Sequence, residues 1–368
     1  MELVSETAVA QRARRSITSF PPAIPQNPYQ RLLYAHLDAL GFPLEDATSF
    51  DVRWLLSVRR DVRAVHFHWP QGYYRHEGRG AVVASWLKIA LLAFRLVLAR
   101  LLRFRVLWTV HQVYPHERGA RGTDRAAAVI LSHAAHTLIV HDLATAEQVG
   151  IELPWAAAKV AVIPHGSYEG VYPAGRGRAD VRAELGLSET TIVFLAFGHV
   201  RGYKDLDVLL DGFAAAESGG IGLVIAGLPL DGPSADLVLE RARADSRIKP
   251  LLGFIPDERV AELFGAADAA VVSRGDGGTS GALILALSLG TPAVVADAPA
   301  YVELIDGGRA GWSFAPGDAK ALGRAFDEAA ADVYEFAAKR EAARSAASRL
   351  SWPEAARRTA ALLSKDAA

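Results

Sequence analysis

Two short segments combine glycine with polar or basic residues just after predicted strands, where anions commonly bind. In residues 273–292 (SRGDGGTSGALILALSLGTP) an apolar strand leads into a glycine-rich loop, and a helix is expected from Ser280 to Gly290. Glycines let backbone N–H groups approach an anion, and a helix N-terminus adds partial positive charge. Ser280 can therefore cap the helix or bind a phosphate oxygen, although an ordinary strand-to-helix turn uses the same residues.

The second segment, residues 197–205 (FGHVRGYKD), also joins a predicted strand to a helix. Arg201 and Lys204 fall in the first helical turn, where the helix macrodipole disfavours cations. Cations become favourable there when an anion such as a diphosphate lies over the junction. The alternative is two solvated basic side chains. Two such junctions in one half of the chain favour a diphosphate site.

Histidines are confined to the first 199 residues of the chain, which hold all 11 of them. His66 and His68 alternate with Val65 and Phe67 in a predicted strand, so the two imidazoles share one face. An H-x-H pair can bind a metal, but no other residues have metal-ligand spacing and the chain has no cysteine. We therefore expect no metal site.

His111 ends the next predicted strand, and His116 and Glu117 follow in the loop. A histidine beside a carboxylate can act as a general base. A structural role is equally plausible for each histidine alone, whereas the group favours function. The chain has no G-x-S-x-G nucleophile elbow, Walker loop or G-x-G-x-x-G after its first strand.

Composition excludes several classes of protein. The 368 residues contain 40 Lys and Arg against 41 Asp and Glu, a net charge of -1 that argues against nucleic-acid binding. The absence of cysteine excludes disulfide scaffolds and thiolate chemistry and favours the cytoplasm. With 51% hydrophobic residues the chain is expected to be globular, and its N-terminus lacks the apolar core of a signal peptide.

Strand and helix patterns alternate along the chain, which predicts parallel β-α-β units in an α/β fold. Strands are expected at 64–69, 105–110, 137–140, 160–163, 192–197, 222–226, 248–251, 269–272, 293–296 and 311–314. Residues 168–180, rich in Gly, Pro and Arg, are predicted to be a linker. We therefore expect one domain over 1–170 and a second over 171–349, with a ligand cleft between them. A terminal helix is expected over 350–368.

Residues 82–103 are predicted to form a long amphipathic helix that carries several cations. Basic amphipathic helices can lie on anionic membranes, which makes this segment a candidate for peripheral membrane contact. The alternative is a helix that faces the core, with arginines extended to solvent. The interrupting charges predict that no segment spans a membrane.

Short motifs spread over nearly the whole chain: HFHWP at 66–70, TVH at 109–111, PHE at 115–117, IPHG at 163–166, G-x-x-R-x-x-K at 198–204, GFIP at 253–256, G-T-P at 290–292 and SW at 351–352. Together they resemble the GT-B nucleotide-sugar glycosyltransferases, particularly the bacterial group 1 branch. The resemblance implies two Rossmann-like domains facing each other across a cleft, with the terminal helix crossing back to the first.

The activity implied is transfer of a hexose from GDP-mannose or a UDP-hexose to a glycan, a lipid-linked sugar or a natural product. This would serve polysaccharide or glycoconjugate synthesis, in the cytoplasm or on the inner face of the plasma membrane. The alternatives are a non-catalytic subunit that binds nucleotide sugar and a nucleotide-sugar 2-epimerase.

The resemblance also implies site residues, with no metal and no cofactor. The donor diphosphate would bind Gly198, Arg201, Lys204, Thr279, Ser280 and Gly281. The nucleoside would contact Leu252, Gly253 and Phe254, and the donor sugar Asp276, Gly277 and Gly278. Catalytic roles would fall to His111, His116 and Glu117, with His111 approaching the sugar from the opposite domain.

One departure from the family pattern concerns stereochemistry. Retaining members carry two glutamates eight positions apart, and Gly277 and Leu285 stand there in this chain, with Asp276 one position away. The T-S-G pattern at 279–281 looks more like branches that include inverting β-mannosyltransferases. Inversion would require a base, for which His116 or Glu117 is expected. Retention would instead depend on cations that stabilise the diphosphate.

Overall fold

The computed structural model describes residues 16–24, 28–47, 49–76, 78, 80–114, 121–202, 205–275, 278–331 and 334–364. The chain divides into two compact units: unit 1 is residues 1–166 with 351–368, and unit 2 is residues 167–350. The segment expected as a linker packs on unit 2, because the N–H of Tyr168 donates to Ser288 Oγ (2.9 Å) and helix α8 (Arg178–Glu184) begins within it.

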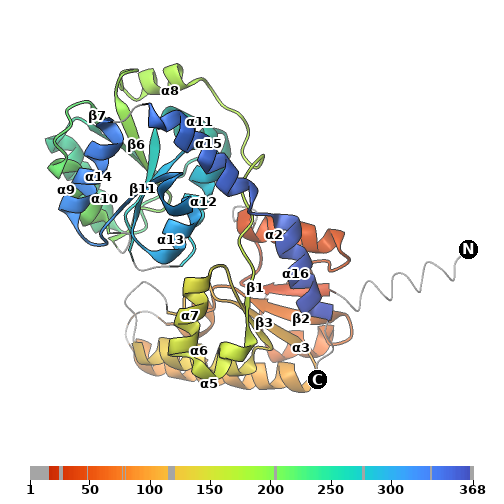
Figure 1. Cartoon of the computed structure of the whole chain (residues 1–368). Helices are drawn as coiled ribbons and strands as arrows, with labels where there is room; N and C mark the ends of the chain where they lie inside the picture. Colours follow the sequence, from red (N-terminus) through yellow and green to blue (C-terminus); the bar gives the residue numbers. More distant parts are fainter. Residues whose placement is uncertain are drawn as a thin grey trace, which may run out of the picture. The chain divides into compact units, whose positions relative to one another are not determined.

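Unit 1 is built on a parallel five-stranded sheet, with the strands in sequence order (Figure 1). They are β1 (Ser16–Phe20), β2 (Val62–Phe67), β3 (Arg105–Thr109), β4 (Thr137–Val140) and β5 (Val160–Val162). Strands β2 to β5 lie close to their predicted positions, whereas β1 was not predicted. Its sequence, SITSF, is buried throughout despite three hydroxyl residues.

Helices cover both faces of this sheet. Helices α2 (Pro28–Ala39) and α16 (Trp352–Ser364) pack with Ile17, Leu107 and Ile139 of the strands on one face. The opposite face, with Val65, Phe67 and Trp108, packs against α5 (Ala81–Leu101), α6 (Arg121–Ala134) and α7 (Leu143–Glu152). Short helices α3 (Val52–Val58) and α4 (Gln71–Tyr74) complete the unit.

The C-terminal helix joins unit 1 although it is last in the sequence, as the resemblance implied. Trp352, at the start of α16, is buried beside Gly166. A Cβ atom on Gly166 would lie 2.2 Å from the indole ring, so only glycine lets the backbone approach the ring this closely. This contact fixes the start of α16 in the core of unit 1.

Helix α5 has one buried and one exposed side. Ser85, Ile89, Leu92, Leu96 and Ala99 are buried against the rest of unit 1. The opposite side exposes large apolar residues, namely Val82, Val83, Trp86, Leu87, Leu91, Phe94, Val97 and Leu101. By length and composition the helix could cross a membrane, contrary to the expectation that charges exclude this. Its buried side, however, belongs to the core of unit 1.

Unit 2 contains a parallel six-stranded sheet in the order β11-β10-β9-β6-β7-β8. The strands are β6 (Ile192–Phe197), β7 (Ile221–Gly227), β8 (Ile248–Leu252), β9 (Ala269–Val272), β10 (Ala293–Ala296) and β11 (Gly311–Phe314). Counted from β6, this is the 3-2-1-4-5-6 order of a Rossmann fold. The strands are nearly continuous apolar runs, as expected when helices cover both faces of a parallel sheet.

Eight helices of the described part of unit 2 surround this sheet (Figure 1). After α8 they are α9 (Leu206–Ala215), α10 (Gly232–Ala244), α11 (Asp257–Ala266), α12 (Gly281–Ser288), α13 (Pro299–Leu304), α14 (Ala319–Ala331) and α15 (Glu335–Ser348). Helices α9 and α12 are the two that follow the anion-suited segments of the sequence. Their N-termini therefore lie at the carboxyl edge of the sheet.

Candidate functional site

Unit 2 holds an open cavity at the carboxyl ends of β6 and β9, with about 600 Å³ of empty space when the solvent at its mouth is included. These neighbouring strands are where the strand order reverses, since β7 and β8 lie on one side and β10 and β11 on the other. In open α/β sheets ligands bind at this switch point. The cavity walls include Gly198, Arg201 and Ser280 from the two predicted segments.

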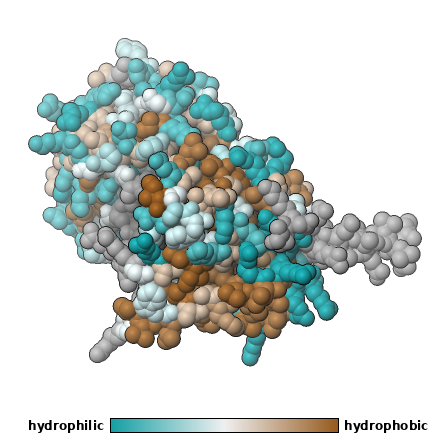
Figure 2. Space-filling view, turned by 60° about the horizontal axis from the view of Figure 1, so that its bottom comes forward, coloured by the Kyte–Doolittle hydropathy of each residue, from teal (hydrophilic) through white to brown (hydrophobic). Residues whose placement is uncertain are grey.

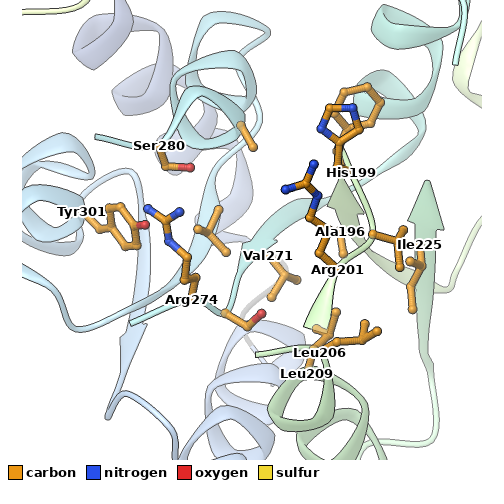
Figure 3. Close-up of a pocket in the computed structure, with 16 residues that line it drawn as sticks. Ala196, His199, Arg201, Leu206, Leu209, Ile225, Val271, Arg274, Ser280 and Tyr301 are labelled. Carbon is orange, nitrogen blue, oxygen red and sulfur yellow. The ribbon is translucent and has the colours of Figure 1, made fainter. Parts of the chain in front are cut away.

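Two arginines bring positive charge to the cavity. Arg201 follows β6 and Arg274 follows β9. Figure 3 shows both guanidinium groups directed to the same end of the cavity as Ser280. Guanidinium groups bind phosphate oxygens through paired N–H donors. The sequence analysis missed Arg274, because it interpreted this loop only through its glycines and serine.

The two loops that carry these arginines are joined by a hydrogen bond. Asp205, the N-cap of α9, accepts it through Oδ2 from the N–H of Gly275 (3.2 Å). Ser280 is the N-cap of α12, and its Oγ accepts from the N–H of Leu283 (3.3 Å). The hydroxyl proton of Ser280 can still be donated to a ligand. The capping role predicted for Ser280 is confirmed.

Gly198 and Gly227 form a close backbone approach at the ends of β6 and β7. Gly227 has φ +149°, and a Cβ there would lie 2.0 Å from the carbonyl oxygen of Gly198. Gly198 itself has φ 104°. Both positions therefore require glycine, and the chain after β6 can turn directly toward Arg201.

Other predicted donor-site residues lie elsewhere or outside the described residues. Leu252 ends β8, followed by Gly253 and the exposed Phe254, and none of the three lines the cavity. Thr279 and Gly281 flank Ser280, and Gly278 precedes them. Five predicted residues fall outside the described part of the chain: His116, Glu117, Lys204, Asp276 and Gly277.

Unit 1 brings five histidines together on the α2 and α16 face of its sheet. His66 and His68 share this face as predicted, and their ring centroids are 4.1 Å apart. The others are His111, His141 and His165, all of which surround the ring of Tyr29 together with His68. In the described ranges no group of three or more His, Asp or Glu side chains is arranged to hold a metal ion.

Burial keeps these imidazoles neutral. Desolvation of the buried ring, and secondly the charge of His141, lower the pKa of His66 to about 3. The same two causes, in the same order of size, lower the pKa of His165 to about 3. The pKa values of His68 and His111 are likewise held well below the usual imidazole range, mainly by desolvation. A neutral imidazole with so low a pKa is a weak general base.

His111 also lines a small crevice in unit 1. Its ring stacks on Trp69, with centroids 4.3 Å apart and planes at 10°. Asp124 lines the same crevice, but Arg75 binds both of its carboxylate oxygens (2.9 and 2.8 Å). The lining combines aromatic and polar side chains, and Asp124 is held there as an ion pair.

Comparison with known proteins agrees with this geometry. Residues 177–349, nearly all of unit 2, match the family model described as "Glycosyl transferases group 1". The chain contains a group 1 glycosyltransferase domain. The domain includes both arginine-bearing loops and the cavity between β6 and β9.

Sequence and structural relatives match more of this chain than the group 1 domain alone. It is 28% identical over 312 residues to the GDP-mannose:glycolipid 4-beta-D-mannosyltransferase of Xanthomonas campestris pv. campestris, which covers 84% of this chain and 81% of the relative. Anabaena HepE, solved with UDP and glucose, matches at TM-score 0.70 and 17% identity, over 98% of this chain and 95% of its own. Sucrose-phosphate synthase from Thermosynechococcus elongatus matches at 0.70 and 18%, over 95% and 98%.

These structural likenesses confirm the GT-B fold expected for this glycosyltransferase. The sequence relative from Xanthomonas, named as a β-mannosyltransferase, agrees with the branch suggested by the T-S-G pattern at 279–281. The histidine group of unit 1 was only partly predicted. His141 and His165 each follow a strand, and the shared strand ends were the available signal.

Proposed function

We propose that this glycosyltransferase transfers mannose from GDP-mannose to a glycolipid with inversion at the anomeric carbon. The observation that carries the proposal is the cavity at the switch point of unit 2, lined by Arg201, Arg274 and Ser280. The Xanthomonas relative supports the choice of donor and acceptor class. GDP-mannose is an α-glycoside, so a β-mannoside product corresponds to inversion.

The leaving group in this reaction is GDP, whose terminal phosphate gains negative charge as the glycosidic bond breaks. Arg201 and Arg274 would stabilise that charge more strongly in the transition state than in the ground state. Lys204, from the same loop as Arg201, would add a third cation. These cations would neutralise the charge on the leaving diphosphate, as a divalent metal does in other sites. We therefore propose that transfer needs no metal.

The acceptor hydroxyl must lose a proton as it attacks. His111 is a poor base because burial depresses the pKa of its imidazole, and Asp124 is neutralised by Arg75. We therefore assign the base to the loop that carries His116 and Glu117, with Glu117 as the carboxylate that takes the proton.

Nucleotide binding by the full-length protein is the direct test of the donor. We expect GDP at about 100 times its dissociation constant to add about 2.7 kcal/mol of stability, raising the melting temperature by roughly 5 °C. UDP, dTDP and ADP at the same concentration should shift it less. The shift should be the same with magnesium or EDTA. A larger shift with UDP than with GDP would contradict the donor, and a shift that needs magnesium would contradict metal independence.

We further propose that the exposed side of α5 rests on an anionic lipid bilayer. Figure 2 shows hydrophobic residues gathered over the part of unit 1 where α5 lies. The helix is about 31 Å long, and Arg100 and Arg103 near its C-terminal end are exposed beside the apolar side. Apolar side chains flanked by cations are typical of helices that lie in the membrane interface. A lipid-linked acceptor would be reached from this position.

Vesicle co-sedimentation should separate this contact from nonspecific adhesion. We expect binding to vesicles with anionic lipid, weaker binding to neutral vesicles, and at least a tenfold loss in the double variant Leu87→Ser, Phe94→Ser. The matched control is Leu143→Ser, Ile151→Ser, which removes two equally exposed apolar side chains from α7 of the same unit. Equal loss in both double variants would contradict a role for α5.

A further inference from the structure

Aspartates stand at the N-cap of several helices, and Asp205 differs from the others. Asp51, Asp142 and Asp231 precede α3, α7 and α10, and each has an extended backbone (φ -128°, -148° and -144°). In each case a carboxylate oxygen accepts from the N–H three residues further on (2.9, 2.7 and 2.7 Å), which is the usual capping bond. Asp205 precedes α9 without such a bond to its own helix.

The backbone of Asp205 is left-handed, with φ 52° and ψ 45°. Residues other than glycine rarely adopt this conformation, because Cβ then lies too close to the following carbonyl oxygen. Among the described residues other than glycine, only Arg103 and Asp306 also have a positive φ. Strained conformations of this kind persist where the surrounding contacts require them, and they cluster at functional sites. A contact made by Asp205 should therefore account for the strain.

The contact that we assign to this strain is the hydrogen bond to the neighbouring loop. Oδ2 of Asp205 accepts from the N–H of Gly275, 3.2 Å away in the loop that follows β9. This N–H belongs to the peptide group that joins Arg274 to Gly275. The carboxylate is thus directed to the other loop rather than to the first turn of α9. The bond links the start of α9 to the backbone of Arg274.

Gly275 is confined by a second neighbour as well. A Cβ atom at this position would lie 2.5 Å from Cβ of Pro316, in the loop after β11, so only glycine lets the backbone lie this close to the proline. Contacts with both Pro316 and Asp205 therefore hold the peptide group that follows Arg274. A guanidinium group on a long side chain binds a phosphate well only when the backbone that carries it is fixed. Figure 3 shows Arg274 directed from this backbone toward Ser280.

We infer that Asp205 is a positioning residue that holds Arg274 in place to bind the diphosphate of the donor. The inference rests on the proposed donor site, and it adds a residue that acts through Arg274 and needs no contact with the substrate. The oxygen acceptor is the essential part of the side chain, because it holds the N–H of Gly275. A role confined to the macrodipole of α9 would instead depend on the negative charge.

The affinity of the full-length protein for GDP, measured by isothermal titration calorimetry, tests this role. Asp205→Gly suits the left-handed backbone and removes the carboxylate, and we expect about tenfold weaker binding. Asp205→Asn keeps an oxygen acceptor and tolerates the same backbone, so it should retain most of the affinity that the glycine variant loses. Equal losses in the two variants would overturn the inference, because they would assign the effect to charge.

The matched control is Asp306→Gly, the same substitution at the other described aspartate of unit 2 with a positive φ (54°). Asp306 precedes β11 and lies near the amino edge of the sheet, whereas the cavity lies at the carboxyl edge. This variant should bind GDP as the wild-type protein does. A tenfold loss in Asp306→Gly would show that the substitution weakens binding without any contact to Arg274, and would overturn the inference.

The dependence of Asp205 on Arg274 is tested by combining the two substitutions. In an Arg274→Ala background, Asp205→Gly should lower GDP affinity by less than about twofold, because the side chain that it positions is already gone. Losses that multiply would overturn the inference. Unchanged affinity in Asp205→Gly alone would also overturn it and leave the proposed site intact. Unchanged affinity in Arg274→Ala would overturn the inference together with the placement of Arg274 in the donor site.

Amide hydrogen exchange of the ligand-free protein gives a readout that does not depend on the proposed transfer. We expect the N–H of Gly275 to exchange at least tenfold faster in Asp205→Gly than in the wild-type protein or in Asp306→Gly. An unchanged exchange rate would show that Asp205 does not hold this loop, whatever the reaction of the enzyme.

Discussion

Unit 1 is expected to lose about 4 kcal/mol of stability between pH 7 and pH 5 from His66 and His165 alone. The folded-state pKa of each is about 3, against 6.5 for an imidazole in water, because both rings are buried. The unfolded chain therefore binds more protons than the folded chain below about pH 6.5. Stability contributed by these groups is fully present above that pH and falls as the pH falls.

Tryptophan fluorescence can follow this loss, because six of the seven tryptophans lie in unit 1 and only Trp312 lies in unit 2. The acidic groups with lowered pKa titrate below pH 5, so the interval from pH 7 to 5 isolates the histidines. His66→Asn should make the melting temperature less dependent on pH. His76→Asn, at an exposed position, is the control and should leave the dependence unchanged. A constant melting temperature over this interval would contradict neutral burial.

Replacing Arg201 by alanine is expected to lower the rate of transfer by about 10²–10³. Its guanidinium lies at the end of the cavity where the diphosphate would bind, and its effect should be greatest on the developing charge of the leaving group. The loss should therefore fall mainly on kcat. Arg274→Ala should have an effect of similar size, since its guanidinium is directed to the same end of the cavity.

The control for these variants is Arg324→Ala, an exposed arginine on α14 of the same unit. It removes the same charge away from the cavity and should retain full activity. Steady-state kinetics with the nucleotide sugar that is transferred will compare the three proteins. Full activity in Arg201→Ala would contradict the assignment of the diphosphate site.

The sheet of unit 2 could be predicted almost residue by residue, because its buried parallel strands are apolar runs that end at glycine, proline or charge. Strands β6, β9, β10 and β11 have the predicted bounds. Strand β1 was missed because its hydroxyl residues look like a loop. In the structure Ser16 Oγ donates to the carbonyl of Asp61 and Ser19 Oγ to that of Pro21, which satisfies these side chains inside the protein.

Site residues were predictable where they depend on local sequence. The strand-to-helix junctions placed Arg201 and Ser280 at one cavity, because strand ends of a parallel sheet meet at one edge. The contact between His68 and His111 depends instead on the register of β2 against β3, in which Phe67 pairs with Trp108. Register and the position of α2 arise from packing across the unit, so the hydrogen bonds that join Tyr34 to His66 and His68 have no signal in the sequence.

The position of α16 has a consequence for biosynthesis. Unit 1 contains residues from both ends of the chain, so its fold cannot be completed until Trp352 and the helix that follows have left the ribosome. Unit 2 is continuous in sequence and can fold first, although its synthesis begins later. During translation the place of α16 beside α2 on the sheet of unit 1 remains open while the 184 residues of unit 2 (167 to 350) are made, which takes roughly 10–40 s. A ribosome that stops early would release a chain with an open hydrophobic face, marked for chaperones or proteases.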